Sequence, residues 1–316
     1  MNADMWDVVV VGGGAAGLSG ALMLGRARRR VLVVDSGEPR NRFTSRMHGV
    51  LGRDSTSPAD LLADGRREVE SYRGTIHRGA ATAARTAEGV FAVEITDLDG
   101  NRFEVLARRL LVATGVRDDL PAIAGLREWW GRGVATCPYC DAYEVGDGRI
   151  GVLATGPGSP GQAQLLRQWS DSIVYLADSV GPPQGDELSD FRTRGIEIAE
   201  GLVERVLDNG DRLRGVRLQD GTDVLLDAIF TIPTLVAADG LLRSLGATVA
   251  PGPMGEFVTV DGSGRTSVDG VWAAGNVVNP AANVPMSIGA GAMAGGAINH
   301  DLVLADIAGT RTANRS

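Results

Sequence analysis

The chain has 316 residues, of which 44% are hydrophobic, and a formal net charge of −8. This length allows about two domains, and the acidic balance argues against a nucleic-acid-binding protein, which needs a basic patch. No segment approaches the roughly 18 consecutive apolar residues of a membrane span, and the N-terminal apolar run lacks the features of a signal peptide, so we expect a cytoplasmic protein without membrane attachment.

The N-terminal segment predicts a βαβ unit that binds a dinucleotide. An apolar run at residues 5–11 leads into a glycine-rich turn at 12–17, and a helical pattern follows through Arg28. A second apolar run, 31–34, ends at Asp35, about twenty residues after the glycines, where a carboxylate can accept hydrogen bonds from ribose hydroxyls. The alternative is a glycine-rich turn that binds no nucleotide.

The small residues of this turn have separate tasks. Gly12 would form the tight turn, Gly14 would let a pyrophosphate approach the backbone, and Gly17 would let the helix pack closely on the strand. The helix start at Ala15 and Ala16 would offer unpaired N–H groups and the positive end of the helix dipole to the phosphates.

Further elements follow in chain order. A helix is expected at residues 61–72, and alternating patterns at 90–95 and 102–106 flank an Asp-Gly turn, which indicates a hairpin. A buried strand at 109–112 then runs into Ala-Thr-Gly at 113–115.

The rest of the chain predicts a second βαβ-like region between about residues 116 and 245. Its clearest elements are a strand at 149–153 and a helix at 162–169. Beyond it, an apolar strand at 268–274 precedes a helix at 289–298 that is rich in glycine and alanine and begins where a ligand would sit.

The only two cysteines, Cys137 and Cys140, form one Cys-x-x-Cys unit, and Asp141 follows directly. Thiols at this spacing can close a small, readily exchanged disulfide in which one sulfur has a lowered pKa. The pair therefore indicates a redox centre.

Two alternatives to a redox pair remain. A zinc site needs about four ligands, and the three histidines, His48, His77 and His300, are scattered through the sequence. A structural disulfide, or two inert buried thiols, is disfavoured because a four-residue loop gains little chain entropy when it is closed. We expect no metal site.

Four motifs occur here in the order and spacing of the low-molecular-weight thioredoxin reductases, which the chain resembles over nearly its whole length. They are the glycine turn with Asp35, the Ala-Thr-Gly, the Cys-Pro-Tyr-Cys-Asp at 137–141, and the Gly-Val-Trp-Ala-Ala-Gly-Asn at 270–276. The resemblance implies an α/β fold with two Rossmann-like nucleotide-binding domains and FAD as the cofactor.

The resemblance also implies a domain organisation and a homodimer. The FAD-binding domain would consist of residues 1–116 and 246–316. An inserted domain, residues 117–245, would carry both the pyridine-nucleotide site and the redox cysteines.

Carried over to this chain, the family's motifs give specific site residues. The candidate cofactor-binding residues are Gly12, Gly14, Ala15, Ala16, Gly17, Asp35, Ser36, Arg42, His48, Ala113, Thr114, Gly115, Gly275, Asn276 and Asn283. Asn276 stands where the family usually has an aspartate that bonds the ribityl chain, and Asn283 lies near the position of a glutamine beside the isoalloxazine. Residues 289–291 would open the last helix toward the flavin. His48 is equally compatible with a local hydrogen-bonding role.

The same resemblance assigns catalytic roles. Cys137 would form a mixed disulfide with substrate, Cys140 would resolve it and face the flavin, and Asp141 would take and return thiol protons. The alternative for Asp141 is a solvated or helix-capping carboxylate.

The chain departs from the thioredoxin reductases at the second nucleotide site. The turn at 154–161 contains Pro157 and Pro160, which lack the N–H groups that would bind a pyrophosphate. The next strand ends at Asp178, where the family has a His-Arg-Arg segment for the 2′-phosphate of NADPH. Loss of nucleotide use is therefore favoured, although Asp178 would also suit the ribose of NADH.

An intact flavin site, an intact dithiol and a degraded nucleotide site are typical of the thioredoxin-reductase-like dithiol oxidases that serve holomycin, gliotoxin and romidepsin biosynthesis. The implied function is oxidation of a small-molecule dithiol to its disulfide, with FAD passing the electrons to O2 and H2O2 released. Two alternatives stay open: a disulfide reductase that uses NADH or a reduced protein partner, and a non-catalytic flavoprotein that binds a partner through its disulfide.

Overall fold

The computed structural model describes residues 5–87 and 89–313. Their contacts divide into two compact units, which are described separately. The first unit takes in the described residues of Met1–Arg42, Pro58–Arg117 and Leu235–Ser316, and the second comprises Phe43–Ser57 and Asp118–Thr234.

These units differ from the expected domain limits in two segments. Residues 235–245, expected in the inserted domain, belong to the first unit because Leu242 is fully buried in its core. Residues 43–57, expected in the FAD-binding domain, belong to the second unit.

The first unit is built on a twisted sheet whose parallel part has the order β3-β2-β1-β5-β18. β4 lies antiparallel between the outer parts of β3 and β5 and completes the predicted hairpin. The strands are β1 Met5–Val11, β2 Val31–Asp35, β3 Thr75–Ala87, β4 Val90–Asp97, β5 Arg102–Val112 and β18 Val271–Ala273.

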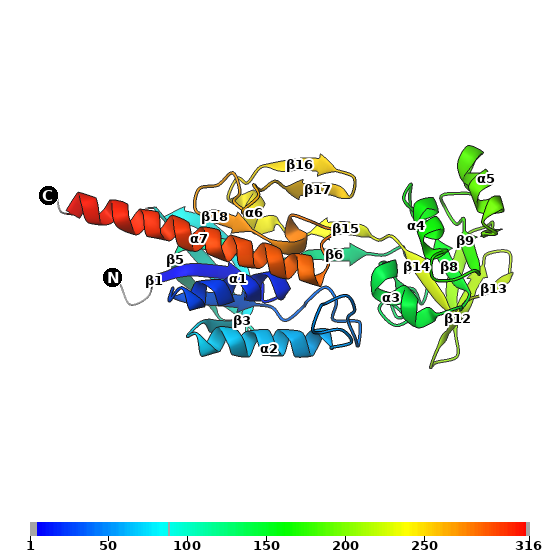
Figure 1. Cartoon of the computed structure of the whole chain (residues 1–316), viewed down its shortest axis with the longest axis horizontal. Coiled ribbons are helices and arrows are strands. Elements are labelled where there is room, and N and C mark those ends of the chain that lie inside the picture. The colour runs from blue at the N-terminus through cyan, green and yellow to red at the C-terminus, as the bar shows by residue number, and fades with distance from the viewer. Residues whose placement is uncertain (1–4, 88, 314–316) are drawn as a thin grey trace. The chain divides into compact units, whose positions relative to one another are not determined.

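Helices cover both faces of this sheet. On one face α7 packs along α1, the red and blue helices of Figure 1, with Leu24, Trp272 and Ile298 buried between sheet and helices. The opposite face buries Val9, Leu110 and Leu242. The helices are α1 Ala15–Arg26, α2 Pro58–Ser71, α6 Gly240–Ser244 and α7 Val284–Ala313, with the short 3-10 helix η1 at Gly275–Val277.

The second unit contains its own parallel sheet, of order β10-β9-β8-β14-β7. Its strands are β7 Val134–Ala135, β8 Ile150–Leu153, β9 Ile173–Leu176, β10 Glu197–Ala199 and β14 Ala228–Thr231. Its helices are α3 Pro138–Val145, α4 Ser159–Leu166 and α5 Gly185–Thr193. Figure 1 shows these elements in green to yellow. The two parallel sheets confirm the predicted α/β class with two Rossmann-like folds.

The remaining strands form small antiparallel or paired ribbons. β11 Val203–Asp208, β12 Leu213–Leu218 and β13 Asp223–Leu225 make a three-stranded sheet. β16 Val249–Gly252 pairs with β17 Gly255–Val258, and β6 Val116–Asp119 pairs with β15 Thr234–Ala237 where the chain passes between the units. No helix in the described part of the chain is long and apolar enough to cross a bilayer.

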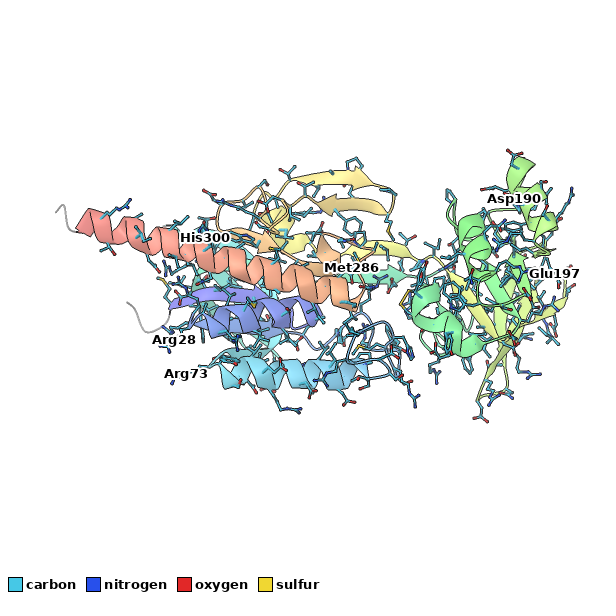
Figure 2. The ribbon with its side chains drawn as sticks, viewed as in Figure 1. Arg28, Arg73, Asp190, Glu197, Met286 and His300 are labelled. Atoms are coloured by element: carbon cyan, nitrogen blue, oxygen red, sulfur yellow. A yellow bond between two sulfur atoms is a disulfide. The ribbon has the colours of Figure 1, made fainter. Side chains whose placement is uncertain are left out.

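Two helix limits differ from the sequence prediction. α1 ends at Arg26, because Arg28 adopts left-handed backbone (φ 62°), as Arg73 does after α2 (φ 65°; Figure 2). α7 begins at Val284, well before the predicted start at 289, and its first turn includes Met286 (Figure 2). The prediction that residues 289–291 open the last helix is therefore wrong: they lie inside it, where Gly291 lets α7 approach the backbone of Ala16.

Candidate active site and cofactor-binding site

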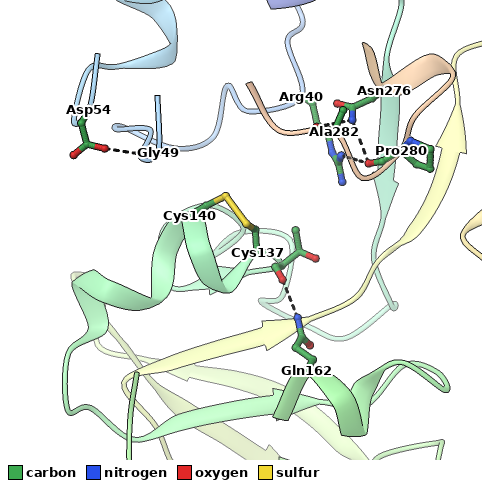
Figure 3. Close-up of a disulfide and its surroundings, with 10 residues drawn as sticks. Arg40, Gly49, Asp54, Cys137, Cys140, Gln162, Asn276, Pro280 and Ala282 are labelled. Carbon is green, nitrogen blue, oxygen red and sulfur yellow. Dashed lines mark hydrogen bonds between the residues drawn. A yellow bond between two sulfur atoms is a disulfide. The ribbon is translucent and has the colours of Figure 1, made fainter. Parts of the chain in front are cut away.

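The redox centre is a disulfide between Cys137 and Cys140 at the start of α3, with their Cα atoms 5.3 Å apart (Figure 3). Cys137 is the N-cap residue, and its carbonyl oxygen accepts hydrogen bonds from the N–H groups of Cys140 (3.1 Å) and Asp141 (3.2 Å). Both cysteines are half-buried. The positive end of a helix favours a thiolate, so this position suits Cys137 for thiol–disulfide exchange.

A side chain that the sequence did not single out holds this loop in place. Gln162, on α4, donates a hydrogen bond of 2.8 Å from Nε2 to the carbonyl of Thr136, directly before Cys137 (Figure 3). Gln162 is 8% exposed, so the bond is shielded from water. Helix α4 therefore supports the redox loop.

Asp141 has the electrostatics of a proton-transfer group. Burial is the main cause that raises the pKa of its carboxyl to about 6; the negative charge of Glu144 acts in the same direction, and His48 acts in the opposite one. A carboxylate that caps a helix has its pKa lowered by the N–H groups it accepts from. The raised pKa therefore favours the acid–base interpretation of Asp141 over the capping one.

His48 lies in the second unit, between two carboxylates, and the structure does not group it with the cofactor-binding candidates of the first unit. Its Nδ1 is 3.4 Å from Asp54 Oδ2, and its Nε2 is 3.3 Å from Glu144 Oε1 on α3. The N–H of Gly49 donates to Asp54 (2.9 Å) and, with His48, lowers the pKa of that carboxyl. The histidine thus connects the 43–57 segment to the helix of the redox pair.

A shallow pocket of about 330 Å³ opens beside this cluster. Two exposed tyrosines of α3, Tyr139 (72% exposed) and Tyr143 (82%), line it one helical turn apart. Its other lining residues are His48, Asp54, Ser55 and Glu144. Tyr139 stands between the two cysteines in sequence, so the pocket and the redox pair share the start of α3, although neither cysteine lines the pocket.

In the turn before α4, the hydroxyl of Ser159 occupies backbone N–H groups of the turn itself. Ser159, fully buried, accepts hydrogen bonds at Oγ from the N–H groups of Thr155 (3.0 Å) and Gly156 (3.4 Å). The N–H of Ser159 in turn donates to the carbonyl of Gly156 (3.0 Å). Pro157 and Pro160 have no N–H to give. The N–H groups of Thr155, Gly156 and Ser159 are thus already used, and the two prolines offer none, which leaves fewer donors for a pyrophosphate in this turn.

Asp178, at the end of β9, has a structural role. Its Oδ1 accepts a 2.8 Å hydrogen bond from the N–H of Val203, and its own backbone is left-handed (φ 41°). Aspartate is one of the few residues that tolerate this conformation. The carboxylate therefore stabilises the turn between the parallel sheet and β11.

In the first unit, the glycine turn fits a bound dinucleotide. A Cβ on Gly12 would collide with the carbonyl of Ala113, and one on Gly17 with the carbonyl of Gly12, so packing alone explains these two. A Cβ on Gly14 would meet no atom within 4 Å. Gly14 precedes Ala15, the first residue of α1, so the open space lies at the helix N-terminus, where a pyrophosphate binds.

Asp35 is almost fully buried at the end of β2, beside this turn. Its Oδ1 accepts from the N–H of Gly37 (2.9 Å), and its Oδ2 lies 3.1 Å from Arg78 Nη1 and 3.5 Å from Arg66 Nη1. Ser36 follows it and is exposed. Arg42 forms an ion pair with Glu38 (3.0 Å) and donates to the carbonyl of Pro39 (3.1 Å).

The other candidates gather at the same edge of the sheet. Backbone bonds join Val11 to Ala113 (2.7 Å) and Val112 to Ala274 (3.1 Å), so the ends of β1, β5 and β18 are adjacent. Thr114 donates from Oγ1 to the carbonyl of Ala238 (2.6 Å), whose N–H donates to Gly115 (3.0 Å).

Gly275 and Asn276 follow β18, and Asn283 caps α7. A Cβ on Gly275 would press against Ala16. The carboxamide oxygen of Asn283 accepts from the N–H of Met286 (3.1 Å). The structure therefore brings the glycine turn, the Ala-Thr-Gly and the Gly-Asn to one edge, while their contacts with the cofactor stay predictions. Among the residues described, no three His, Cys, Asp or Glu side chains come together as a metal site.

Comparison with known proteins identifies the family. The model of the pyridine nucleotide-disulphide oxidoreductases matches residues 6–295. Thioredoxin reductase tcpT of Claviceps purpurea is 32% identical over 326 aligned residues, which cover 98% of each chain. The crystal structure of HlmI superposes with a TM-score of 0.91 at 43% identity, covering 100% of this chain and 98% of HlmI. An oxidoreductase from Agrobacterium tumefaciens gives 0.88 at 38% identity, with 95% and 99% coverage.

The chain belongs to the pyridine nucleotide-disulphide oxidoreductase family and is an oxidoreductase. Within that family it is a thioredoxin-reductase-like flavoprotein whose cofactor is FAD, which confirms the resemblance seen in the sequence.

Proposed function

We propose that this protein is an FAD-dependent dithiol oxidase: it converts a small-molecule dithiol to an intramolecular disulfide and transfers the two electrons to O2, releasing H2O2. The observation that carries the proposal is the self-closed turn before α4, where Ser159 occupies the N–H groups of Thr155 and Gly156. An enzyme without a working pyridine-nucleotide site has to receive its electrons from a thiol substrate.

In the proposed reaction one thiolate of the substrate attacks the sulfur of Cys137. The Cys137–Cys140 bond breaks, a mixed disulfide forms, and Cys140 leaves as a thiolate. The second thiolate of the substrate then attacks the substrate sulfur of the mixed disulfide, which closes the product disulfide and releases Cys137. This step replaces the expected resolution by Cys140, because attack by Cys140 would only restore the enzyme disulfide and return the dithiol unoxidised. Two electrons have then moved from the substrate to the enzyme pair, and the two enzyme thiolates can take up the two protons that the substrate thiols lost on ionising.

The residues around the disulfide support these steps. The N-terminus of α3 stabilises the departing thiolate of Cys137. Asp141, with a pKa of about 6, exchanges protons with the substrate thiols near neutral pH. FAD, when bound, supplies the two-electron acceptor chemistry that restores the disulfide and delivers the electrons to O2.

The two units take complementary parts in this proposal. The first unit would bind FAD through the glycine turn and the sheet edge, and the second would carry the thiol–disulfide exchange. The pocket with Tyr139 and Tyr143 would accept the substrate beside the redox pair. A homodimer and a cytoplasmic location stay predictions from the sequence.

The test compares electron donors on the purified FAD-containing protein. With dithiothreitol as the probe in air, we expect oxygen uptake and H2O2 in equal amounts, and no uptake from the Cys137→Ser variant. In anaerobic stopped-flow mixing, NADPH and NADH should bleach the flavin slowly or not at all. Rapid, saturable bleaching by either nucleotide at micromolar concentration would contradict the oxidase and favour a reductase.

A further inference from the structure

Asn276, in the 3-10 helix η1 that follows β18, has an unusual environment. Its amide nitrogen, Nδ2, lies within hydrogen-bond distance of three backbone carbonyl oxygens: those of Asn279 (3.0 Å), Pro280 (3.2 Å) and Ala282 (2.8 Å). Figure 3 shows the last two of these residues beside Asn276. Three acceptors around one atom require that atom to be the nitrogen of the carboxamide. One amide NH2 group therefore holds the carbonyl groups of the 279–282 turn together.

This turn sets the beginning of α7. The N–H of Asn279 donates back to Gly275 (2.9 Å), and the N–H of Ala282 donates to Asn279 (3.0 Å). The next residue is Asn283, which caps α7. Arg40 also reaches this turn, donating from Nη1 to the carbonyl of Pro280 (3.2 Å). The position of the α7 N-terminus thus depends on the carbonyls that Asn276 holds.

We propose that Asn276 is a positioning residue for the FAD site whose function an aspartate cannot supply. Its nitrogen is committed to the turn, so the only atom that it can offer to a ligand is the carboxamide oxygen, a neutral acceptor. A carboxylate here would place an acceptor oxygen against three carbonyl oxygens, with no hydrogen to share. The proposal concerns how this chain holds its cofactor and does not depend on O2 as the electron acceptor.

The Asn276→Asp variant tests the proposal through the protonation of the introduced carboxyl. At pH 8 the carboxylate repels the carbonyls, and the guanidinium known to reach the same turn is that of Arg40, which donates to Pro280. We expect the thermal midpoint to fall by about 5 °C and FAD to bind about tenfold more weakly or worse. At pH 5 the carboxyl is partly protonated and regains one donor, so both losses should shrink.

Asn209→Asp is the matched control. Asn209 uses its oxygen to accept from the N–H groups of Arg212 (2.9 Å) and Asp211 (3.3 Å), a role that a carboxylate keeps. This variant carries the same change in charge and should match the wild-type protein in thermal midpoint and FAD release at both pH values.

The measurements are the thermal midpoint of the FAD-containing protein and the release of FAD on dilution, followed by flavin fluorescence. Wild-type FAD retention and stability of Asn276→Asp at pH 8, or equal losses at pH 5 and pH 8, would overturn the proposal. If Asn276→Asp does not fold, Asn276→Ala takes its place as the test. Asn276→Ala should release FAD faster than the wild-type protein, by the same factor at both pH values. Wild-type retention of FAD by this variant would overturn the proposal.

Discussion

Replacing Asp141 with asparagine should stabilise the oxidised protein at alkaline pH while abolishing dithiol turnover. Burial and the charge of Glu144 raise the pKa of Asp141 from 3.8 to about 6. The folded state therefore holds a proton that the unfolded state releases, and stability is lost as the pH rises from about 4 to about 6. At 1.36 kcal/mol per pKa unit, the full cost above pH 6 is about 3 kcal/mol.

An amide at this position never ionises and carries no such cost. The difference in unfolding free energy between Asp141→Asn and wild type should therefore grow by up to about 3 kcal/mol between pH 4 and pH 8, as measured by urea unfolding at several pH values. Asp171→Asn is the control, because the Asp171 side chain is 98% exposed and pairs only at the surface with Arg167, so its effect should stay below about 1 kcal/mol. A difference for Asp141→Asn that does not change with pH would refute the argument.

Three further predictions concern the redox pair, its acid and the cofactor. Cys137→Ser and Cys140→Ser should each abolish dithiol-dependent oxygen uptake while the protein still purifies yellow; substantial turnover by either variant would disprove the exchange mechanism. His48→Gln should shift the acidic limb of the pH–rate profile to higher pH, because His48 lowers the pKa of Asp141; an unchanged or downward shift would contradict the electrostatic role. Gly14→Val should fold normally, because Gly14 has extended backbone and open space at its Cβ, yet purify without FAD; flavin bound at the wild-type level would exclude Gly14 from the cofactor site.

The sequence was most informative where the chemistry requires particular residues at fixed spacing. A pyrophosphate turn needs glycines, and an exchangeable disulfide needs two nearby cysteines, so the fold class and the redox pair could be predicted. The start of α7 was predicted too late because small residues at 289–291 resemble a helix opening. The stronger signal was Asn283 followed by Val284 and Pro285, a cap residue with proline in the first turn.

Other features depend on contacts between residues far apart in sequence. The bond from Gln162 to Thr136 spans 26 residues, and the approach of His48 to Glu144 spans 96, so no local pattern indicates them. The bonds of Ser159 to the N–H groups of Thr155 and Gly156 are local in sequence. They could still not be predicted, because the sequence does not show whether a buried hydroxyl accepts from the turn or bonds elsewhere.

The turn before α4 also accounts for the support that the redox pair receives. A nucleotide-binding turn keeps its N–H groups unpaired for the ligand, which leaves the following helix dependent on that ligand for satisfaction of its end. Here Ser159 satisfies Thr155 and Gly156 internally. The turn therefore keeps its shape through internal bonds, and from α4 the side chain of Gln162 holds Thr136 and the start of α3. The same serine that occupies N–H groups of the turn thus also helps to fix the base of the redox loop, and this is the arrangement that the proposed dithiol oxidase would need.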